Sequence, residues 1–256
     1  MSEEVSEQYL RESIQHLTSR PTRYALSSHY TEAARWAFRK LSGWCWSCDF
    51  QPFPVGNDSC MNVLANRGAA AASIIVVAHL DSIGGSGADD NASGCAGLLE
   101  LARLLSFTEE SRCIRFVLTG AEEIGGEGGQ HYIASLPPEH RAAIKAVINI
   151  DQIGRRRTPE LTVKLETKPE YEWLANVLEA AALAHTDLRV EKCFEPWGGD
   201  HITFLKAGIP AVLTIQGEDE QIHSPEDREE FIDYGLVAEI TRMNLAAILK
   251  LSRGKP

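Results

Sequence analysis

A histidine and an aspartate stand two residues apart at the end of an apolar run. The run covers residues 73–78, and His79 and Asp81 follow it. Because residues two apart on a strand share a face, Asp81 can accept the free N–H of the His79 imidazole, a contact that fixes the tautomer of a metal-binding histidine. The sequence Gly-Ala-Asp-Asp-Asn-Ala-Ser-Gly at 87–94 then brings two more carboxylates. Such a strand tip is typical of metal ligands in α/β enzymes.

Other apolar stretches also end in acids or a histidine. They are followed by Glu122 and Glu123 after 115–119, by Asp151 after 147–150 and by His223 after 211–215. In a doubly wound sheet the carboxyl ends of the strands meet at one edge, so these side chains should lie close to His79 and Asp89. One catalytic zinc needs three protein ligands, whereas five ligands with one bridging carboxylate suit two ions.

Two pairs of adjacent acids need separate roles. Glu122 and Glu123 cannot point the same way in an extended segment, so one can bind metal while the other faces the attacking water as a general base. In the second pair we expect Asp89 to be the ligand. Asp90 or Asn91 would then cap a helix that begins near residue 92.

Alternating strands and helices must position these residues. We expect two amphipathic helices at about 4–19 and 30–41, and then a hairpin of 44–53 and 61–66. Further strands are expected at 74–79, 113–119, 146–151, 161–166, 188–193 and 210–215, and further helices at 91–105, 129–136, 170–185, 200–207 and 234–251. This order predicts a single-domain, three-layer α/β/α fold over 1–256, with a mixed, centrally parallel sheet and residues 1–42 packed on it as helices.

Composition and charge exclude several classes of function. The 256 residues are enough for one buried core, and the net charge of −11 argues against nucleic acid or an anionic membrane as a partner. No stretch approaches the ~20 apolar residues that a membrane-spanning helix needs. The acidic N-terminus lacks the pattern of a secretory signal, so we expect a cytoplasmic protein, although a secreted protein whose signal had been removed would look the same. The sequence does not predict an oligomeric state.

Two further patterns have ordinary explanations. Cys45 and Cys48 form a CxxC, but on a strand residues three apart face opposite sides, and no second CxxC completes a zinc site. The run Arg155–Arg157 could reach a substrate carboxylate, but a solvated turn is the expected structure for a short charge run.

The motifs together resemble those of a known enzyme family. In family order they are His79-Leu80-Asp81, the segment 87–94, Gly120-Ala121-Glu122-Glu123-Ile124-Gly125, Asn149-Ile150-Asp151, Asp200-His201 and His223-Ser224-Pro225-Glu226-Asp227. From about Asn62 to the C-terminus the chain resembles the co-catalytic di-zinc aminopeptidases, a family that also contains glutamate carboxypeptidases and glutaminyl cyclases. The resemblance implies the zinc-exopeptidase type of α/β fold.

The resemblance also implies a metal-ligand set. Asp89 would bridge two zinc ions, which cobalt or manganese could replace. His79 and Asp151 would complete the site of the first ion, and Glu123 and His223 that of the second.

The same resemblance implies roles for three more acids. Glu122 would be the general base, Asp81 would orient the histidine, and Asp200 would support the ligands from behind. The implied activity is hydrolysis of the N-terminal peptide bond of a peptide or small amide substrate, with preference for an uncharged N-terminal residue. Carboxypeptidase action, cyclisation of an N-terminal glutamine and a catalytically inactive binding homologue are the alternatives.

The segment that would shape the substrate pocket departs from the family pattern. Gln152 stands where an apolar residue is common, and 195–199, with Trp197, stands where a tyrosine often helps to bind the oxyanion. Trp197 would either line the pocket or cover the loop. Asp200 and His201 resemble the corresponding pair of glutaminyl cyclases, and His201 would either face the site or simply begin a helix.

Overall fold

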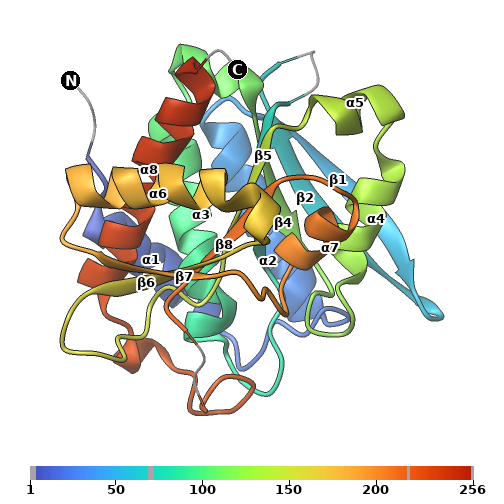
Figure 1. Cartoon of the computed structure of the whole chain (residues 1–256). Helices are drawn as coiled ribbons and strands as arrows, with labels where there is room; N and C mark the ends of the chain where they lie inside the picture. The colour runs from blue at the N-terminus through green and yellow to red at the C-terminus, as the bar shows by residue number, and fades with distance from the viewer. Residues whose placement is uncertain (1–3, 69–71, 218–219, 255–256) are drawn as a thin grey trace.

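A mixed sheet forms the centre of the molecule (Figure 1). The computed structural model describes residues 4–68, 72–217 and 220–254, and within them the sheet has eight strands in the order β1-β2-β4-β3-β5-β8-β6-β7. The strands are β1 (Ser47–Val55), β2 (Asp58–Asn66), β3 (Ile74–His79), β4 (Ile114–Thr119), β5 (Ala146–Ile150), β6 (Thr162–Glu166), β7 (Arg189–Cys193) and β8 (Ala211–Ile215). The central strands β4, β3, β5 and β8 are parallel. β1 pairs antiparallel to β2, and β2 pairs antiparallel to β4, while β6 pairs antiparallel to β8 and parallel to β7. The predicted mixed, centrally parallel sheet is confirmed.

Helices cover both faces of this sheet and complete three layers (Figure 1). One face carries α1 (Glu7–Thr18), α2 (Ser28–Gly43), α3 (Gly94–Leu105), α6 (Glu172–His185) and α8 (Tyr234–Arg253), and the other carries α4 (Glu127–Ser135), α5 (Pro138–Ala143) and α7 (His201–Lys206). Short helical turns occur at η1 (Ala88–Ser93), η2 (Glu109–Cys113), η3 (Pro169–Tyr171) and η4 (Glu229–Phe231). The sequence did not predict α5, which has no buried residue and therefore no apolar periodicity to reveal it.

The parallel strands bring their C-terminal ends to one edge of the sheet. Every residue of β3, β5 and β8 is buried, as expected for strands covered on both faces. His79 of β3 pairs with Thr119 of β4, and Ile150 of β5 pairs with Thr214 of β8. The segments that follow these strands therefore begin side by side, which is why acids distant in sequence gather there.

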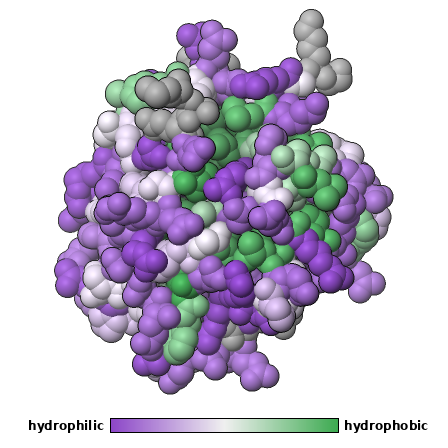
Figure 2. Space-filling model, turned by 90° about the vertical axis from the view of Figure 1, so that its left-hand side faces the viewer, coloured by the Kyte–Doolittle hydropathy of each residue, from purple (hydrophilic) through white to green (hydrophobic). Residues whose placement is uncertain are grey.

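The surface over α6 and α8 combines polar and apolar areas. Figure 2 shows mostly hydrophilic residues on this side, interrupted by a hydrophobic area in its upper half. Val177 and Ala180 of α6 and Ala246 of α8 line a groove between these two helices. None of the described helices is long and apolar enough to cross a membrane. None of the six cysteines, all within the described segments, forms a disulfide.

A buried asparagine closes the loop that follows β4. Asn62 of β2 accepts a hydrogen bond from the amide of Gly120 at 3.0 Å and donates one to the carbonyl of Gly128 at 2.9 Å. Gly128 has to be glycine for this approach, since a Cβ there would lie 2.3 Å from the carbonyl oxygen of Gly120. The loop between them carries Glu122 and Glu123, so Asn62 fixes both ends of the segment that holds these two acids.

Replacing Asn62 by alanine should therefore destabilise the protein. The change removes both hydrogen bonds and leaves the buried amide of Gly120 without its side-chain acceptor, which costs about 2 kcal/mol of the free energy of unfolding. Urea unfolding followed by circular dichroism measures this loss. The matched control is Asn176→Ala on the exposed surface of α6, which should change stability by less than about 0.5 kcal/mol. Equal effects of the two substitutions would contradict the role of Asn62.

Candidate metal centre

The carboxylate of Asp90 lies between two imidazoles. Its Oδ1 is 3.0 Å from Nε2 of His79, and its Oδ2 is 3.2 Å from Nε2 of His223. Each imidazole also meets a second carboxylate: Asp151 Oδ1 is 3.4 Å from His79 Nε2, and Glu123 Oε2 is 2.9 Å from His223 Nε2. Two similar groups of one histidine and one acid thus share a single carboxylate.

This position belongs to Asp90, and the expectation that Asp89 would occupy it is wrong. The segment η1 does not continue as a regular helix here, because Asp90 (φ −108°, ψ 90°) and Asn91 (φ −132°, ψ 47°) have non-helical backbones. The Asp89 side chain faces the loop after β5, where Oδ1 accepts a hydrogen bond from the amide of Gly154 at 2.7 Å and Oδ2 lies 3.5 Å from Arg157. Neither Asp90 nor Asn91 occupies the N-cap position of α3, which is Ser93, although the side chain of Asn91 accepts a hydrogen bond from the amide of Gly94, the first residue of the helix.

Asp227 holds the pair of aspartates in this arrangement. Its two carboxylate oxygens accept hydrogen bonds from the amides of Asp89 and Asp90 at 2.8 and 3.0 Å. The sequence contained Asp227 within the motif at 223–227, but no role could be read for it. The backbone of His223, in the same motif, packs closely against Gly84. A Cβ on Gly84 would lie only 2.1 Å from the carbonyl oxygen of His223.

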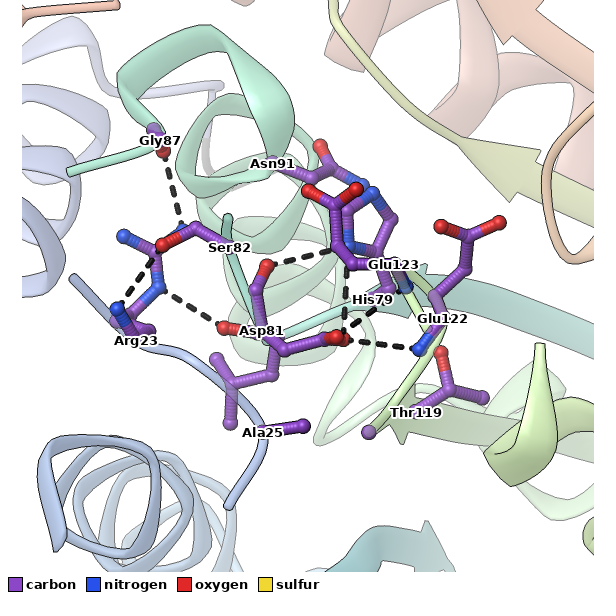
Figure 3. Close-up of polar contacts among 12 residues, drawn as sticks. Arg23, Ala25, His79, Asp81, Ser82, Gly87, Asn91, Thr119, Glu122 and Glu123 are labelled. Carbon is purple, nitrogen blue, oxygen red and sulfur yellow. Dashed lines mark hydrogen bonds and ion pairs between the residues drawn. The ribbon is translucent and has the colours of Figure 1, made fainter. Parts of the chain in front are cut away.

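Asp81 contacts both His79 and the loop that carries Glu122 and Glu123 (Figure 3). Its carboxylate lies 3.7 Å from Nδ1 of His79 and accepts hydrogen bonds from the amides of Glu122 at 3.2 Å and Glu123 at 3.3 Å. Figure 3 shows the side chains of Glu122 and Glu123 leaving the loop in different directions. Glu123 reaches His223, whereas Glu122 lines an adjacent cavity. The two side chains thus point to different places, and the division into one metal ligand and one general base stays a prediction.

A buried arginine that the sequence did not single out anchors the neighbouring loop (Figure 3). Arg23 is fully buried, and its guanidinium donates to the carbonyls of Leu80 at 2.9 Å, Gly87 at 3.1 Å and Ser86. Its own amide donates to the hydroxyl of Ser82 at 2.9 Å. Arg23 therefore fixes both ends of the segment that connects His79 to Asp90. No local pattern marks such a residue, because its partners lie about sixty positions away in sequence.

The charges of the cluster shift one another strongly. Burial alone would raise the pKa of Asp90, but hydrogen bonds from His223 and His79 hold it well below its ordinary value. The hydrogen bond to Asp90 raises the pKa of His223 to about 9. Burial raises the pKa of Glu122 to about 8 and that of Glu123 to about 9. Without a metal ion, the site therefore retains protons at neutral pH.

Asp200 and His201 lie behind Glu122 at the start of α7. Both are buried, and Thr119 donates its hydroxyl hydrogen to Asp200. Burial raises the pKa of Asp200 to about 6 and lowers that of His201 to about 3. The ring nitrogens of His201 have no hydrogen-bond partner in the described part of the chain. His201 both begins the helix and faces inward, and Asp200 adds to the negative charge around Glu122.

The remaining candidate residues lie at the margin of the site. Gln152 adopts a positive φ of 48°, and its backbone carbonyl accepts from Gln216. Trp197 is 61% exposed, so it does not cover a buried loop, and Gly198 and Gly199 line the cavity beside Glu122 instead.

The run Arg155–Arg157 is not the solvated turn expected from its charge. Arg156 lies 2.8 Å from Asp233, and Arg157 contacts Asp89. Arg155 donates to Gln221 and lies over the ring of Phe231. These contacts tie the turn to the loop beside the cluster, which the pattern of charges alone could not reveal.

The donor atoms fit a zinc site. Ligand atoms of His79, Asp90 and Glu123 lie within 4.8 Å of one another, and imidazole nitrogen and carboxylate oxygen are ligands that zinc prefers. Oε1 of Glu123 is buried and has no hydrogen-bond partner among the described residues. Several buried carboxylates in one place repel one another unless cations or protons intervene. A metal ion would satisfy both conditions.

Comparison with known proteins identifies related chains. Residues 62–248 match the model of peptidase family M28. The chain is 33% identical over 171 residues to aminopeptidase YwaD of Bacillus subtilis, an alignment that covers 62% of this chain and 36% of that protein. The chain thus spans about a third of the length of this relative.

Solved structures show the same fold. A zinc aminopeptidase from Bacillus subtilis, BSAP, superposes with a TM-score of 0.86 at 15% identity, covering 98% of this chain and 97% of that one. A glutaminyl cyclase from Porphyromonas gingivalis superposes with a TM-score of 0.78 at 19% identity, covering 96% and 99%. At these identities, the likeness concerns the fold alone.

Replacing Asp90 should remove metal binding far more than replacing Asp89. Replacing a residue that only hydrogen-bonds to a metal ligand lowers the metal affinity by about 10–100-fold. Asp90→Asn would replace a shared ligand itself, so it should weaken zinc binding by more than about 100-fold. Asp89→Asn keeps an oxygen that can accept from Gly154 and should stay within about tenfold of the unchanged protein. Competition with a fluorescent zinc chelator measures both. The reverse order of affinities would restore Asp89 as the ligand.

The metal-free protein should lose stability as the pH rises. The pKa values of Glu122, Glu123 and His223 are raised by folding, so between about pH 6.5 and 9 the folded protein binds more protons than the unfolded chain. The free energy of unfolding then decreases with pH. Thermal melts of chelator-treated protein should show a falling Tm across this window, and zinc should reduce the fall by replacing the protons. A Tm that rises over the same window would contradict these shifts.

Proposed function

This chain belongs to peptidase family M28, and from that membership we propose that it is a metallo-aminopeptidase with two zinc ions and Glu122 as its general base. The reaction is hydrolysis of the N-terminal peptide bond of a peptide. The observation that supports it most directly is the Asp90 carboxylate shared by two imidazoles, each of which has a further acid beside it.

Two groups of residues would hold the ions. His79, Asp90 and Asp151 would bind one, and Glu123, His223 and the same Asp90 the other. Bound zinc supplies Lewis acidity: it lowers the pKa of a water molecule and polarises a carbonyl group. Cobalt or manganese could use the same donors, because imidazole and carboxylate discriminate weakly among these ions.

Glu122 has the position that a general base needs. Its backbone amide is fixed by Asp81, yet its side chain leaves the ligand cluster and lines the open cavity beside it. The carboxylate of Glu122 can therefore accept a proton from an attacking water and later donate it to the leaving nitrogen. Asp200, buried behind the loop, adds negative charge that favours the protonated form of Glu122.

The charge of the cluster favours a substrate with a free α-amine. An ammonium group is attracted by the carboxylates of Asp90, Glu123 and Asp151, and a blocked N-terminus gains nothing from them. If the α-amine binds beside these carboxylates, the bond that is cleaved is the first peptide bond of the substrate. We expect a preference for an uncharged first residue. Cyclisation of an N-terminal glutamine and carboxypeptidase action are the competing reactions, and they use different test substrates.

Glu122→Gln should separate catalysis from metal binding. Loss of the general base should lower kcat on leucine p-nitroanilide by about 100- to 10,000-fold while zinc content remains unchanged. Glu127→Gln, an exposed acid at the start of α4, is the matched control and should retain full activity. N-acetyl-leucine p-nitroanilide should not be hydrolysed, because its α-amine is blocked.

Other outcomes would identify a different activity. Turnover only of glutamine-initiated peptides, or only of peptides blocked at the N-terminus, would contradict the aminopeptidase proposal. A zinc-loaded protein that turns over none of these substrates would instead be a binding homologue. A Glu122→Gln variant with undiminished kcat would exclude Glu122 as the base.

A further inference from the structure

A large cavity lies between α4 and α7, beside the metal centre. Its volume is about 910 Å³, within the range of small-molecule and peptide sites. Glu122 lines it, and the apolar side chains of Ile133 from α4 and Ile202 from α7 form part of its walls. Two lining residues are cationic, Arg141 of α5 and Lys206 at the last residue of α7. The cavity therefore combines a catalytic acid, apolar walls and positive charge.

The two cations lie away from Glu122 along the helices. Arg141 donates from Nη2 to the carbonyl of Ile133 at 2.8 Å, near the C-terminal end of α4, whereas Glu122 precedes the N-terminal end of α4. The six residues from the start of α4 to Ile133 rise about 9 Å. An extended peptide advances about 3.5 Å per residue, so this distance corresponds to two or three residues.

Neither cation has an acidic partner in the part of the chain that the structure describes. Lys206 is exposed, and Nε of Arg141 is buried without a hydrogen-bond partner among the described residues. By contrast, Arg156 and Arg157 each contact an acid, Asp233 and Asp89 respectively. The cavity thus has positive charge available for an anionic group.

Glu122 determines which part of a substrate enters this cavity. The carboxylates of Asp90, Glu123 and Asp151 attract the α-amine and hold the N-terminal residue on the metal side. Glu122 must reach the nitrogen that leaves, so the peptide beyond the scissile bond passes Glu122 and extends between α4 and α7.

We propose that this cavity binds the leaving part of the peptide and that Arg141 and Lys206 bind a carboxylate two or three residues beyond the scissile bond. The inference rests on the proposed aminopeptidase function. The carboxylate is either the C-terminus of a tri- or tetrapeptide or an acidic side chain at that distance. The substrate class is therefore short peptides with a free C-terminus, or longer ones with an acidic residue at that position.

Two pairs of substrates test the carboxylate site. Leu-Gly-Gly is compared with its C-terminal amide, and Leu-Gly-Glu-amide with Leu-Gly-Gln-amide, so that the first pair reports a terminal carboxylate and the second a side-chain carboxylate. In at least one pair, the peptide with the carboxylate should have a KM about fivefold lower than that of its partner peptide, with a similar kcat. A change of about fivefold is the effect of one partly exposed ion pair. Equal KM values within both pairs would overturn the proposal.

Charge removal at the cavity should abolish the preference. Lys206→Met and Arg141→Met should raise the KM of the acid towards that of the amide, and Arg141→Lys should restore part of the difference. Lys145→Met is the matched control, since Lys145 is exposed and directly precedes β5, at the opposite edge of the sheet. A ratio of the two KM values that is unchanged in Lys206→Met and Arg141→Met would contradict the assignment.

A binding measurement separates this site from the chemistry. In the Glu122→Gln variant, calorimetric titration with Leu-Gly-Gly should give a Kd about fivefold lower than titration with its amide. Leucine p-nitroanilide, which has no carboxylate, reports the aminopeptidase reaction alone. Its hydrolysis with equal Kd values for acid and amide would refute only the carboxylate site. Absence of its hydrolysis would refute the proposed function and with it the substrate class.

Discussion

The structure around the metal centre depends on one carboxylate that faces two imidazoles. Asp90 can contact His79 and His223 together only if its backbone leaves the helical path and its neighbours hold it there. Asp227 fixes its amide, and Arg23 fixes the carbonyls at both ends of the preceding loop. Several buried acids repel one another at this point, so the surrounding hydrogen bonds hold them in an arrangement that favours a cation.

The sheet makes this arrangement possible. Four parallel central strands end at one edge, and the segments that follow β3, β4 and β5 each bring an imidazole or a carboxylate there. Asn62 closes the loop that carries Glu122 and Glu123, and Asp81 orients the amides of both. Hydrogen bonds to the backbone thus hold these loops in place, while buried side-chain oxygens of Glu123 and Asp151 have no hydrogen-bond partner among the described residues.

The sequence was sufficient to predict most of the fold, because buried parallel strands are continuous apolar runs that alternate with amphipathic helices. It also indicated which segments form the candidate metal centre, since acids and histidines at strand ends have few structural explanations. It could not distinguish Asp89 from Asp90: the two are chemically identical, and their directions depend on backbone angles that no residue type determines. Arg23, Asn62 and Asp227 act on distant partners, so no local pattern reveals them. Arg155–Arg157 had the composition of a solvated turn, and only the packing of the turn against Asp89 and Asp233 shows otherwise.

The central claim is that Asp90 is shared by two metal ions. The most direct measurement is a crystal structure of the zinc-loaded protein with anomalous diffraction data collected on both sides of the zinc absorption edge. Two zinc peaks, one beside His79 and Asp151 and one beside Glu123 and His223, with an oxygen of Asp90 bound to each, are the predicted result. A single peak, or peaks coordinated by Asp89 with Asp90 turned away, would contradict it.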